Sequence, residues 1–204
     1  MTNNRIAVSV APPDTEACLA HLHEMAPRVG MAEVRLDLME SFDLPRLIGA
    51  APCPLIITCR PPREGGVFAG TEAERLAVLD QAIELGCAYV DVEWDCAAEL
   101  ARRRRSPTRL MVSRHWHDRM PATLRPAYAE MLPHADVVKL VGMARDPVDM
   151  LPIFDLLGHA PGPVVGQPLG QREPVIQAVV LRAADHLQAQ LLHAVGVGGA
   201  QGVG

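Results

Sequence analysis

The stretch Glu33-Val34-Arg35-Leu36-Asp37 places charged and apolar residues at alternate positions. Successive side chains of a β-strand point to opposite faces, so the three charged residues would share one face of a strand. An open parallel sheet with helices on both sides would bury that charged face at a large cost. In a barrel the apolar face meets the surrounding helices, and the inward face can form a polar pocket near the carboxyl ends of the strands. The alternation therefore predicts a (β/α)8 TIM-type barrel.

Short β-branched runs alternate with longer helical patterns along the chain, which is typical of βα units in a parallel sheet. The predicted strands cover residues 5–10, 31–38, 55–60, 89–94, 109–114 and 136–141. The predicted helices cover residues 14–26, 71–85, 95–105 and 147–157. Thr71 and Glu74 have the spacing of a capping box, and Gly86 marks the end of that helix. The segment Asp91-Val92-Glu93 repeats the alternation of charged and apolar residues.

The composition indicates one globular domain. The chain has 204 residues, of which 49% are hydrophobic and 3% aromatic, enough for one core of aliphatic side chains. A net charge of −5 argues against a general nucleic-acid or anionic-membrane binder, because such proteins need clustered surplus cations. The five cysteines are odd in number and lack Cys-x-x-Cys spacing, so neither a disulfide framework nor a zinc site is predicted. Since we find neither a signal-peptide core nor a membrane-length apolar run, we expect a cytoplasmic protein.

Lys139 stands in the middle of the apolar, β-branched part of the stretch 134–143. The strand pattern predicts that its side chain is buried, with no obvious partner for the ammonium beside it in the sequence. Desolvation favours the neutral amine, and a neutral amine can add to a ketone to form an imine. The alternative interpretation is that Lys139 lies near a strand end and reaches out to water.

Charged residues gather at the carboxyl ends of the predicted strands, which meet on one face of a barrel. They are Glu33, Arg35, Arg60, Asp91, Glu93, His115 and Lys139. Arginines supply forked donors for carboxylate or hydroxyl oxygens, and His115 is suited to transfer protons. A lysine and a histidine in one pocket indicate imine chemistry. The alternative is that the carboxylates and arginines only pair with one another as structural ions.

Five short phrases of the chain carry a family resemblance. They are Glu33-Val-Arg35-Leu-Asp37, Thr58-Cys-Arg60-Pro-Pro-Arg-Glu64-Gly65-Gly66, Asp91-Val-Glu93, Ser113-Arg-His115 and Ala135-Asp136-Val-Val-Lys139. In order and spacing they resemble the successive signatures of type I 3-dehydroquinate dehydratase, over residues 5 to 165. The resemblance implies a single barrel domain over residues 1–204, assembled as a homodimer. It also implies a lyase that dehydrates 3-dehydroquinate to 3-dehydroshikimate in the shikimate pathway of aromatic amino acid biosynthesis, without metal or cofactor.

The same resemblance implies roles for individual residues. Lys139 would form the imine (Schiff base), His115 would act as acid and base, and Glu64 would orient His115. Glu33, Arg35 and Arg60 would contact the substrate. A protonated imine lets the electrons of a neighbouring carbanion spread onto nitrogen, so His115 could remove that proton and then protonate the leaving hydroxyl group.

Two further patterns have simpler explanations. The stretch 115–117 has the His-x-His spacing of some metal hydrolases, but it follows the fifth predicted strand, and the later histidines fall in predicted loops or helices. We therefore interpret His117 as a loop histidine and predict no metal site. The four arginines 102–105 end a predicted helix, where cations suit the macrodipole, and nothing aromatic accompanies them. They predict a solvated helix end rather than a nucleic-acid interface.

The chain changes in composition near Val165, since only Gln81 of its seven glutamines precedes Gly166. We predict a helix over residues 177–192, a weak eighth strand over 191–195 and a flexible Gly-rich end. In this region the family carries an arginine for the substrate carboxylate and a lid. Arg172 is the candidate for that arginine, and Gln201 matches the lid poorly. We therefore expect residues 165–204 to be a divergent or truncated tail, with the last two βα units incomplete or degenerate.

A divergent tail leaves two functional hypotheses open. The first is an active, imine-forming dehydratase. The second is a catalytically impaired barrel of the same family that binds or senses a ligand without turning it over.

Overall fold

The computed structural model describes residues 7–103, 105–170 and 180–182. Within these residues the strands form one sheet whose spatial order follows the order of the chain. The strands are β1 (Ala7–Val10), β2 (Met31–Arg35), β3 (Leu55–Thr58), β4 (Tyr89–Glu93), β5 (Arg109–Trp116), β6 (Val137–Met143), β7 (Val164–Leu169) and β8 (Val180–Arg182). Strands β1 to β7 are parallel, and β8 runs antiparallel to β7.

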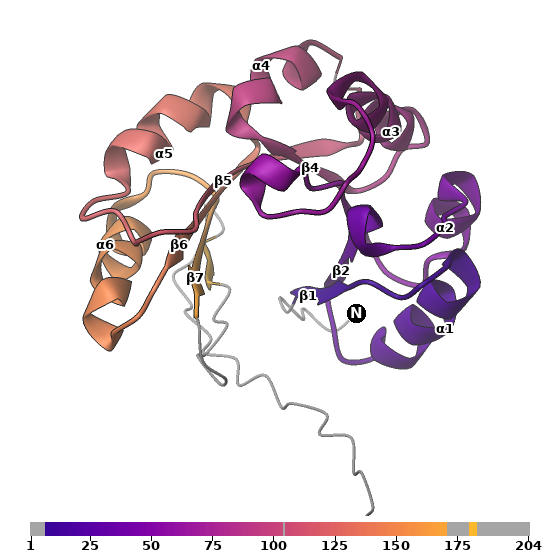
Figure 1. Cartoon of the computed structure of the whole chain (residues 1–204), viewed down its shortest axis with the longest axis horizontal. Helices are drawn as coiled ribbons and strands as arrows, with labels where there is room; N and C mark the ends of the chain where they lie inside the picture. Colours follow the sequence, from indigo (N-terminus) through magenta and orange to yellow (C-terminus); the bar gives the residue numbers. More distant parts are fainter. Residues whose placement is uncertain (1–6, 104, 171–179, 183–204) are drawn as a thin grey trace, which may run out of the picture.

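The α-helices lie on the outer side of the curved sheet (Figure 1). They are α1 (Thr15–Met25), α2 (Leu44–Ala50), α3 (Glu72–Glu84), α4 (Trp94–Arg103), α5 (Arg125–Met131) and α6 (Leu151–His159). Short 3-10 turns are η1 (Leu36–Leu38), η2 (Pro62–Glu64), η3 (Leu132–His134) and η4 (Pro147–Met150). None of the helices in the described ranges is both long and apolar enough to cross a bilayer.

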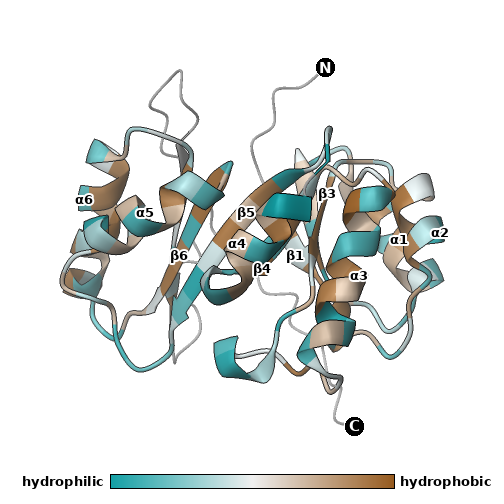
Figure 2. Ribbon diagram, turned by 90° about the horizontal axis from the view of Figure 1, so that it is seen from above, coloured by the Kyte–Doolittle hydropathy of each residue, from teal (hydrophilic) through white to brown (hydrophobic). Residues whose placement is uncertain are grey.

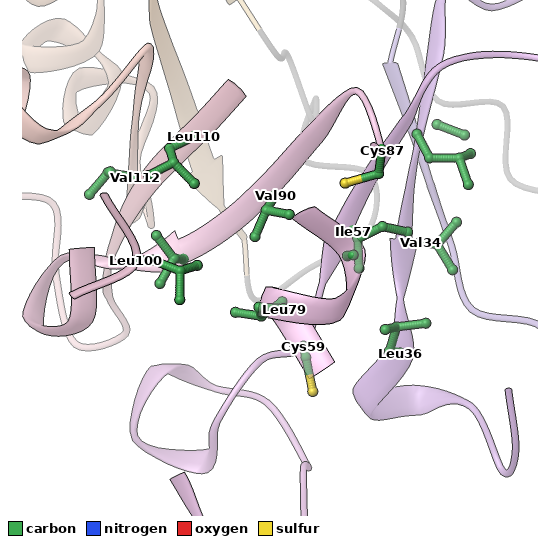
Figure 3. Packing of buried hydrophobic residues seen from close by; sticks show 14 of the residues in the cluster. Val34, Leu36, Ile57, Cys59, Leu79, Cys87, Val90, Leu100, Leu110 and Val112 are labelled. Carbon is green, nitrogen blue, oxygen red and sulfur yellow. The ribbon is translucent and has the colours of Figure 1, made fainter. Parts of the chain in front are cut away.

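The main hydrophobic core lies between the outer face of the sheet and the helices. Val34, Ile57 and Val90 point outward from their strands and pack with Leu79 of α3 and Leu100 of α4 (Figure 3). All five side chains are fully buried. Burial of one such aliphatic side chain stabilises the fold by about 1.5–3 kcal/mol. In Figure 2 the helices carry both hydrophobic and hydrophilic residues, as expected for helices with one face on this core.

The inner face of the sheet has two parts. A small apolar cluster near the amino ends of the strands consists of Ile56, Met111, Val137 and Val165. Two residues further along these strands, polar side chains replace the apolar ones, as at Ser113. The predicted alternation is therefore confirmed within β2 and β4, whose apolar residues face the helices and whose charged residues face the interior. Asp37, predicted on the same strand as Glu33 and Arg35, lies instead in η1 because β2 ends at Arg35.

Most predicted elements are confirmed, with ends that differ by a few residues. The capping box of Thr71 and Glu74 begins α3, and Gly86, with φ of 74°, follows its last turn. Among the α-helices and the parallel strands, three were not predicted, namely the seven-residue helices α2 and α5 and the strand β7. Both helices carry a proline in their first turn, and both are too short to show a clear apolar period in the sequence.

The expectation of a barrel with incomplete last units is confirmed. Figure 1 shows the sheet as an arc with β1 and β7 toward its two ends, and in the described part of the chain β1 pairs only with β2. The helix predicted over 177–192 is wrong at Val180–Arg182, which form β8. Residues 170–179 are too few for a helical crossover, which needs a dozen residues or more, whereas an antiparallel return needs few. The strand predicted over 191–195 lies outside the described residues.

Candidate active site

The predicted site residues come from neighbouring strands and meet inside the curled sheet. Lys139 on β6 donates hydrogen bonds to Glu33 Oε1 on β2 at 2.9 Å and to Asp91 Oδ2 on β4 at 3.0 Å. Because three strands separate β2 from β6 in the sheet, these side chains can meet only across its concave interior. Thr58 Oγ1 also donates to Glu33 Oε1 at 2.9 Å. The carboxylate of Glu33 is therefore held in place from two strands.

The charge of Lys139 differs from the sequence prediction. The residue is only 7% exposed, and burial by itself would lower the pKa of its amine. The carboxylates of Asp91 and Glu33 outweigh burial, so that the pKa of Lys139 lies above its ordinary value of 10.5. The predicted burial is confirmed, but the neutral amine expected from burial alone is wrong, because Glu33 and Asp91, which are distant in the sequence, pair with Lys139. Lys139 is an ammonium at neutral pH in this structure.

Arg60 is 3% exposed and lies among acidic side chains. Its Nη2 is 3.0 Å from Asp91 Oδ1, and its Nη1 is 2.6 Å from Glu93 Oε1. Nη1 also donates to Ser113 Oγ at 2.7 Å. Burial would lower the pKa of Arg60, but Asp91 and Glu93 raise it. Arg60 is thus the centre of a buried ion network, and its predicted contact with a substrate stays a prediction.

Asp91 connects Arg60 to Lys139. Its Oδ1 accepts a hydrogen bond from Ser113 Oγ at 2.6 Å, in addition to the ion pair with Arg60. Burial would raise the pKa of Asp91, yet the cations Arg60 and Lys139 hold that pKa well below its usual range. Asp91 is therefore ionised at neutral pH and fixes the position of the Lys139 ammonium.

His115 and Glu64 form a second pair beside the lysine. The Oε2 of Glu64 accepts the backbone N–H of His115 at 2.8 Å and lies 2.9 Å from His115 Nδ1. A carboxylate can only accept, so Nδ1 carries the hydrogen and Nε2 keeps its lone pair. Burial and the positive charges of Arg60 and Lys139 lower the pKa of His115, although the hydrogen bond to Glu64 opposes them. His115 is therefore a neutral imidazole with a free acceptor nitrogen at neutral pH.

The two pairs lie close together. Ser113 is the register partner of Lys139, and His115 lies two residues further along β5 on the same face. Strands are spaced by about 4.8 Å and rise about 3.3 Å per residue, which places the Cα atoms of Lys139 and His115 about 8 Å apart. Their side chains are long enough to reach one small molecule from two directions.

Arg35 forms a two-point ion pair with a neighbouring carboxylate. Its Nε and Nη2 donate to Asp37 Oδ1 and Oδ2, both at 2.8 Å. The Arg35 side chain is 22% exposed and that of Asp37 is fully buried. Arg35 is thus fixed at one side of its guanidinium group, which leaves its Nη1 for another partner.

Several residues of this network were not selected from the sequence. Thr58 and Ser113 each stand two positions before a charged strand-end residue, so the period-two pattern carried a signal for them, and Asp91 was expected at the strand ends but was given no role of its own. Arg75 on α3 is fully buried, pairs with Glu93 Oε2 and donates to the carbonyl of Cys59 at 3.0 Å. No sequence pattern distinguishes Arg75 from a solvated helical arginine.

Some predicted residues lie elsewhere. Arg172 and Gln201 fall outside the described residues. His117, predicted as a loop histidine, is exposed and stacks on His115 with ring centroids 6.0 Å apart. In residues 7–103, 105–170 and 180–182, no three His, Cys, Asp or Glu side chains are grouped closely enough to hold a metal ion.

Known proteins similar to this chain include both sequence relatives and solved structures. A bifunctional 3-dehydroquinate dehydratase/shikimate dehydrogenase of Arabidopsis thaliana is 33% identical over 74% of this chain, which spans 26% of that protein. A 3-dehydroquinate dehydratase of Desulfotalea psychrophila is 32% identical over 78% of this chain and 74% of its own length. The crystal structure of 3-dehydroquinate dehydratase from Geobacillus kaustophilus superimposes with a TM-score of 0.71 and 23% identity, over 83% of this chain and 75% of the other.

The similarity extends to the sequence model of a whole family, described as type I 3-dehydroquinase, which matches residues 6–177. That range contains every strand from β2 to β7 and all the charged side chains of the interior described above. The chain therefore belongs to the type I 3-dehydroquinase family.

Proposed function

We propose that this protein is a hydro-lyase that converts 3-dehydroquinate to 3-dehydroshikimate through an imine on Lys139. The observation that carries the proposal is the Lys139 amine, 7% exposed and held between Glu33 and Asp91, one strand from the Glu64–His115 pair. Relatives at 32–33% identity are named for this dehydration. An amine and a free imidazole nitrogen in one pocket are the two groups that such an elimination needs.

Imine formation starts with the loss of a proton from Lys139. Its raised pKa keeps the amine protonated at rest, so the lone pair becomes available only when a neighbour accepts that proton. The carboxylates within hydrogen-bond distance are Glu33 and Asp91. The neutral amine then adds to the ketone carbon to give a carbinolamine, and the carboxyl group that accepted the proton returns it to the carbinolamine hydroxyl, which leaves as water and gives the iminium. Glu33 and Asp91 stabilise the positive charge of the iminium where they stabilised the ammonium.

Elimination then requires a base and an acid. The free Nε2 of His115 removes the proton next to the iminium carbon, and the electron pair spreads onto nitrogen. The resulting imidazolium, held by Glu64 at Nδ1, returns the proton to the hydroxyl group, which leaves as water. A second water hydrolyses the imine, so that Lys139 is restored and the enone product is released. Arg35, Arg60 and Arg172 remain our candidates for contacts to the substrate oxygens.

We further propose, from the family likeness, that the enzyme acts as a cytoplasmic homodimer in the shikimate pathway. Light scattering on the purified protein would test the dimer. The alternative function, an impaired barrel that binds a ligand without turnover, predicts substrate binding without formation of the enone product.

The decisive experiment is trapping with borohydride. Lys139 is the only lysine in the chain, so an imine with 3-dehydroquinate should be reduced to an adduct on the peptide that contains residue 139. Lys139→Met should give no adduct. His115→Ala should still give the adduct, because carbonyl addition precedes proton transfer, while turnover falls by about 10²- to 10⁴-fold.

Each other outcome has a definite meaning. An adduct on the amino terminus, or none, would refute the imine. An adduct in the parent protein without any enone absorbance would favour the impaired alternative. If His115→Ala kept turnover within about tenfold of the parent, below the usual contribution of a general acid or base, His115 would not be the proton-transfer group.

A further inference from the structure

The buried carboxylate of Asp37 is surrounded entirely by hydrogen-bond donors. Arg35 donates to both oxygens at 2.8 Å. The backbone N–H of Arg60 donates to Oδ1 at 3.1 Å, and the backbone N–H of Val67 donates to Oδ2 at 3.2 Å. Burial would raise the pKa of Asp37, but the hydrogen bonds from Arg35 and Arg60 hold the pKa below its usual value. Asp37 is therefore ionised at neutral pH and has all its acceptor positions in use.

Two of these donors are the ends of one loop, residues 60–67. The loop closes on itself through Gly66 N–H to Pro61 O at 3.0 Å and Phe68 N–H to Arg60 O at 3.3 Å. Gly66 lies so close to the chain at Arg60 that a Cβ atom there would be 2.0 Å from the Arg60 carbonyl oxygen. A single side chain, Asp37, thus binds both ends of a compact loop that tolerates little rearrangement.

This loop carries Glu64, the partner of His115. Glu64 is the last residue of η2 and reaches His115 with one oxygen, at 2.8 Å from the backbone nitrogen and 2.9 Å from Nδ1. Both hydrogen bonds to His115 depend on the position of the loop relative to β5. Asp37, which lies on η1 directly after β2, holds the loop in that position through its hydrogen bonds to Arg60 and Val67. The same carboxylate fixes Arg35.

We propose that Asp37 is a positioning residue that sets two parts of the site at once. Through Arg60 N–H and Val67 N–H it places Glu64 against His115, and through its two-point pair it fixes the orientation of the Arg35 guanidinium. Asp37 takes no part in bond making. The proposal deepens the proposed function, on which the catalytic consequence rests, whereas the structural link from Asp37 to His115 can be measured without any substrate.

The chemistry of the carboxylate supplies a sharp variant. In Asp37→Asn one oxygen becomes an NH₂ group of nearly the same size. Whichever way the amide turns, this NH₂ meets either the Arg60 N–H and Arg35 Nε or the Val67 N–H and Arg35 Nη2. Donor then faces donor, so one end of the loop must come loose. Asp37→Ser, which is smaller and admits water, is the second variant if Asp37→Asn does not fold.

The first test is amide hydrogen exchange, followed by NMR on the protein without substrate. We expect Asp37→Ser to exchange the amide protons of both Val67 and His115 at least about tenfold faster than the parent, and Asp37→Asn to do so for His115 together with Arg60 or Val67. Glu64→Ala is the matched control, since it should release the His115 amide but leave Val67 protected. Arg35→Met should leave both protected. Unchanged protection of His115 in both Asp37 variants would overturn the proposal.

The second test separates positioning from general damage. Lys139, Glu33 and Asp91 do not contact Asp37, so borohydride trapping on Lys139 should continue in Asp37→Asn. Turnover should fall by about tenfold or more, because the acid and base group is misplaced. Equal loss of trapping and turnover would indicate a merely structural role and refute the proposal. If trapping failed in the parent as well, the proposed function would be wrong, while the exchange result would still decide the role of Asp37.

Discussion

At the scale of single residues, the site holds one titratable group that is charged at neutral pH beside one that is neutral. Lys139 is held as an ammonium by Asp91 and Glu33, whereas burial keeps the neighbouring His115 imidazole neutral. Two titratable groups whose surroundings move their pKa values apart are a common feature of acid and base catalysis. The lysine must lose its proton before it reacts, while the histidine is ready to accept one.

The pH dependence of the reaction should report on His115 and Glu64. Since His115 acts as a base only when neutral and its pKa lies below 6.5, kcat/KM should rise with pH through a limb centred below pH 6.5. Glu64→Gln keeps an acceptor for Nδ1 but removes the negative charge, so the pKa of His115 should fall further. We expect the limb to move to lower pH and kcat to fall about tenfold. Glu130→Gln, an exposed carboxylate near Arg114, is the control, and an unmoved limb in Glu64→Gln would contradict the assignment.

The residue types of the site could be predicted from the sequence, but their charges could not. Alternation along β2 and β4 placed Glu33 and Asp91 on the inner face, and the apolar run placed Lys139 inside. The partners of Lys139 lie 106 and 48 positions away in the chain, so no local window contains them. A pKa depends on distances in space, and for this reason the neutral amine was a wrong prediction although the burial was correct.

At the scale of elements, periodicity predicted the strands from β1 to β6 because their apolar positions face a helix layer. It did not predict α2, α5 or β7. The antiparallel direction of β8 depends on how few residues precede it rather than on any property of Val180–Arg182. Helix α3 shows another limit of periodicity, because its buried face includes Arg75, which an apolar pattern counts as exposed.

Arg75 should anchor α3 to the ends of β3 and β4. Its guanidinium pairs with Glu93 and donates to the carbonyl of Cys59, so Arg75→Met would leave a buried carboxylate with one partner fewer. We expect a loss of about 3–5 kcal/mol in the free energy of unfolding, measured by urea denaturation. Arg103→Met removes an exposed pair on α4 and should cost less than about 1 kcal/mol. Similar losses in the two variants would show that Arg75 has no anchoring role.

At the scale of the whole molecule, the main hydrophobic core and the buried charges lie on opposite faces of the same sheet. The aliphatic core stabilises the outer face, and the inner face holds a network of ion pairs that depends on pH. Such a network adds stability only while its members keep the charges found in the fold.

Thermal stability should therefore be greatest over a middle range of pH and should fall at both lower and higher pH. The lowered pKa of His115 means that the unfolded chain binds this proton more readily, so stability should fall as pH drops through 6.5. Asp91, whose pKa is lowered, adds stability above about pH 3.8, and this stability is lost in stronger acid. Glu93, whose pKa is raised, offsets part of that stability. Lys139 adds stability below pH 10.5, and this stability is lost as the pH rises through the higher pKa that Lys139 has in the folded protein.

Melting temperatures measured from pH 4 to 11 would check this dependence. His115→Gln should melt at nearly the same temperature at pH 7 and pH 5.5, whereas the parent should melt lower at pH 5.5. A parent protein with no loss between these values, or an equal loss in His115→Gln, would contradict the role given to this histidine.

Each strand from β2 to β7 pairs with the strand made just before it, and this order has a consequence for synthesis on the ribosome. The sheet can grow by addition of one unit at a time as the chain emerges. Glu33, however, precedes Lys139 by 106 residues, which is roughly 5–20 s at ordinary translation rates. During that time the Glu33 carboxylate on the inner face lacks the ammonium that pairs with it and stays hydrated. We expect nascent chains to gain protease resistance abruptly when β6 leaves the exit tunnel, because the Lys139 ammonium then pairs with Glu33 and Asp91 and lets the interior close.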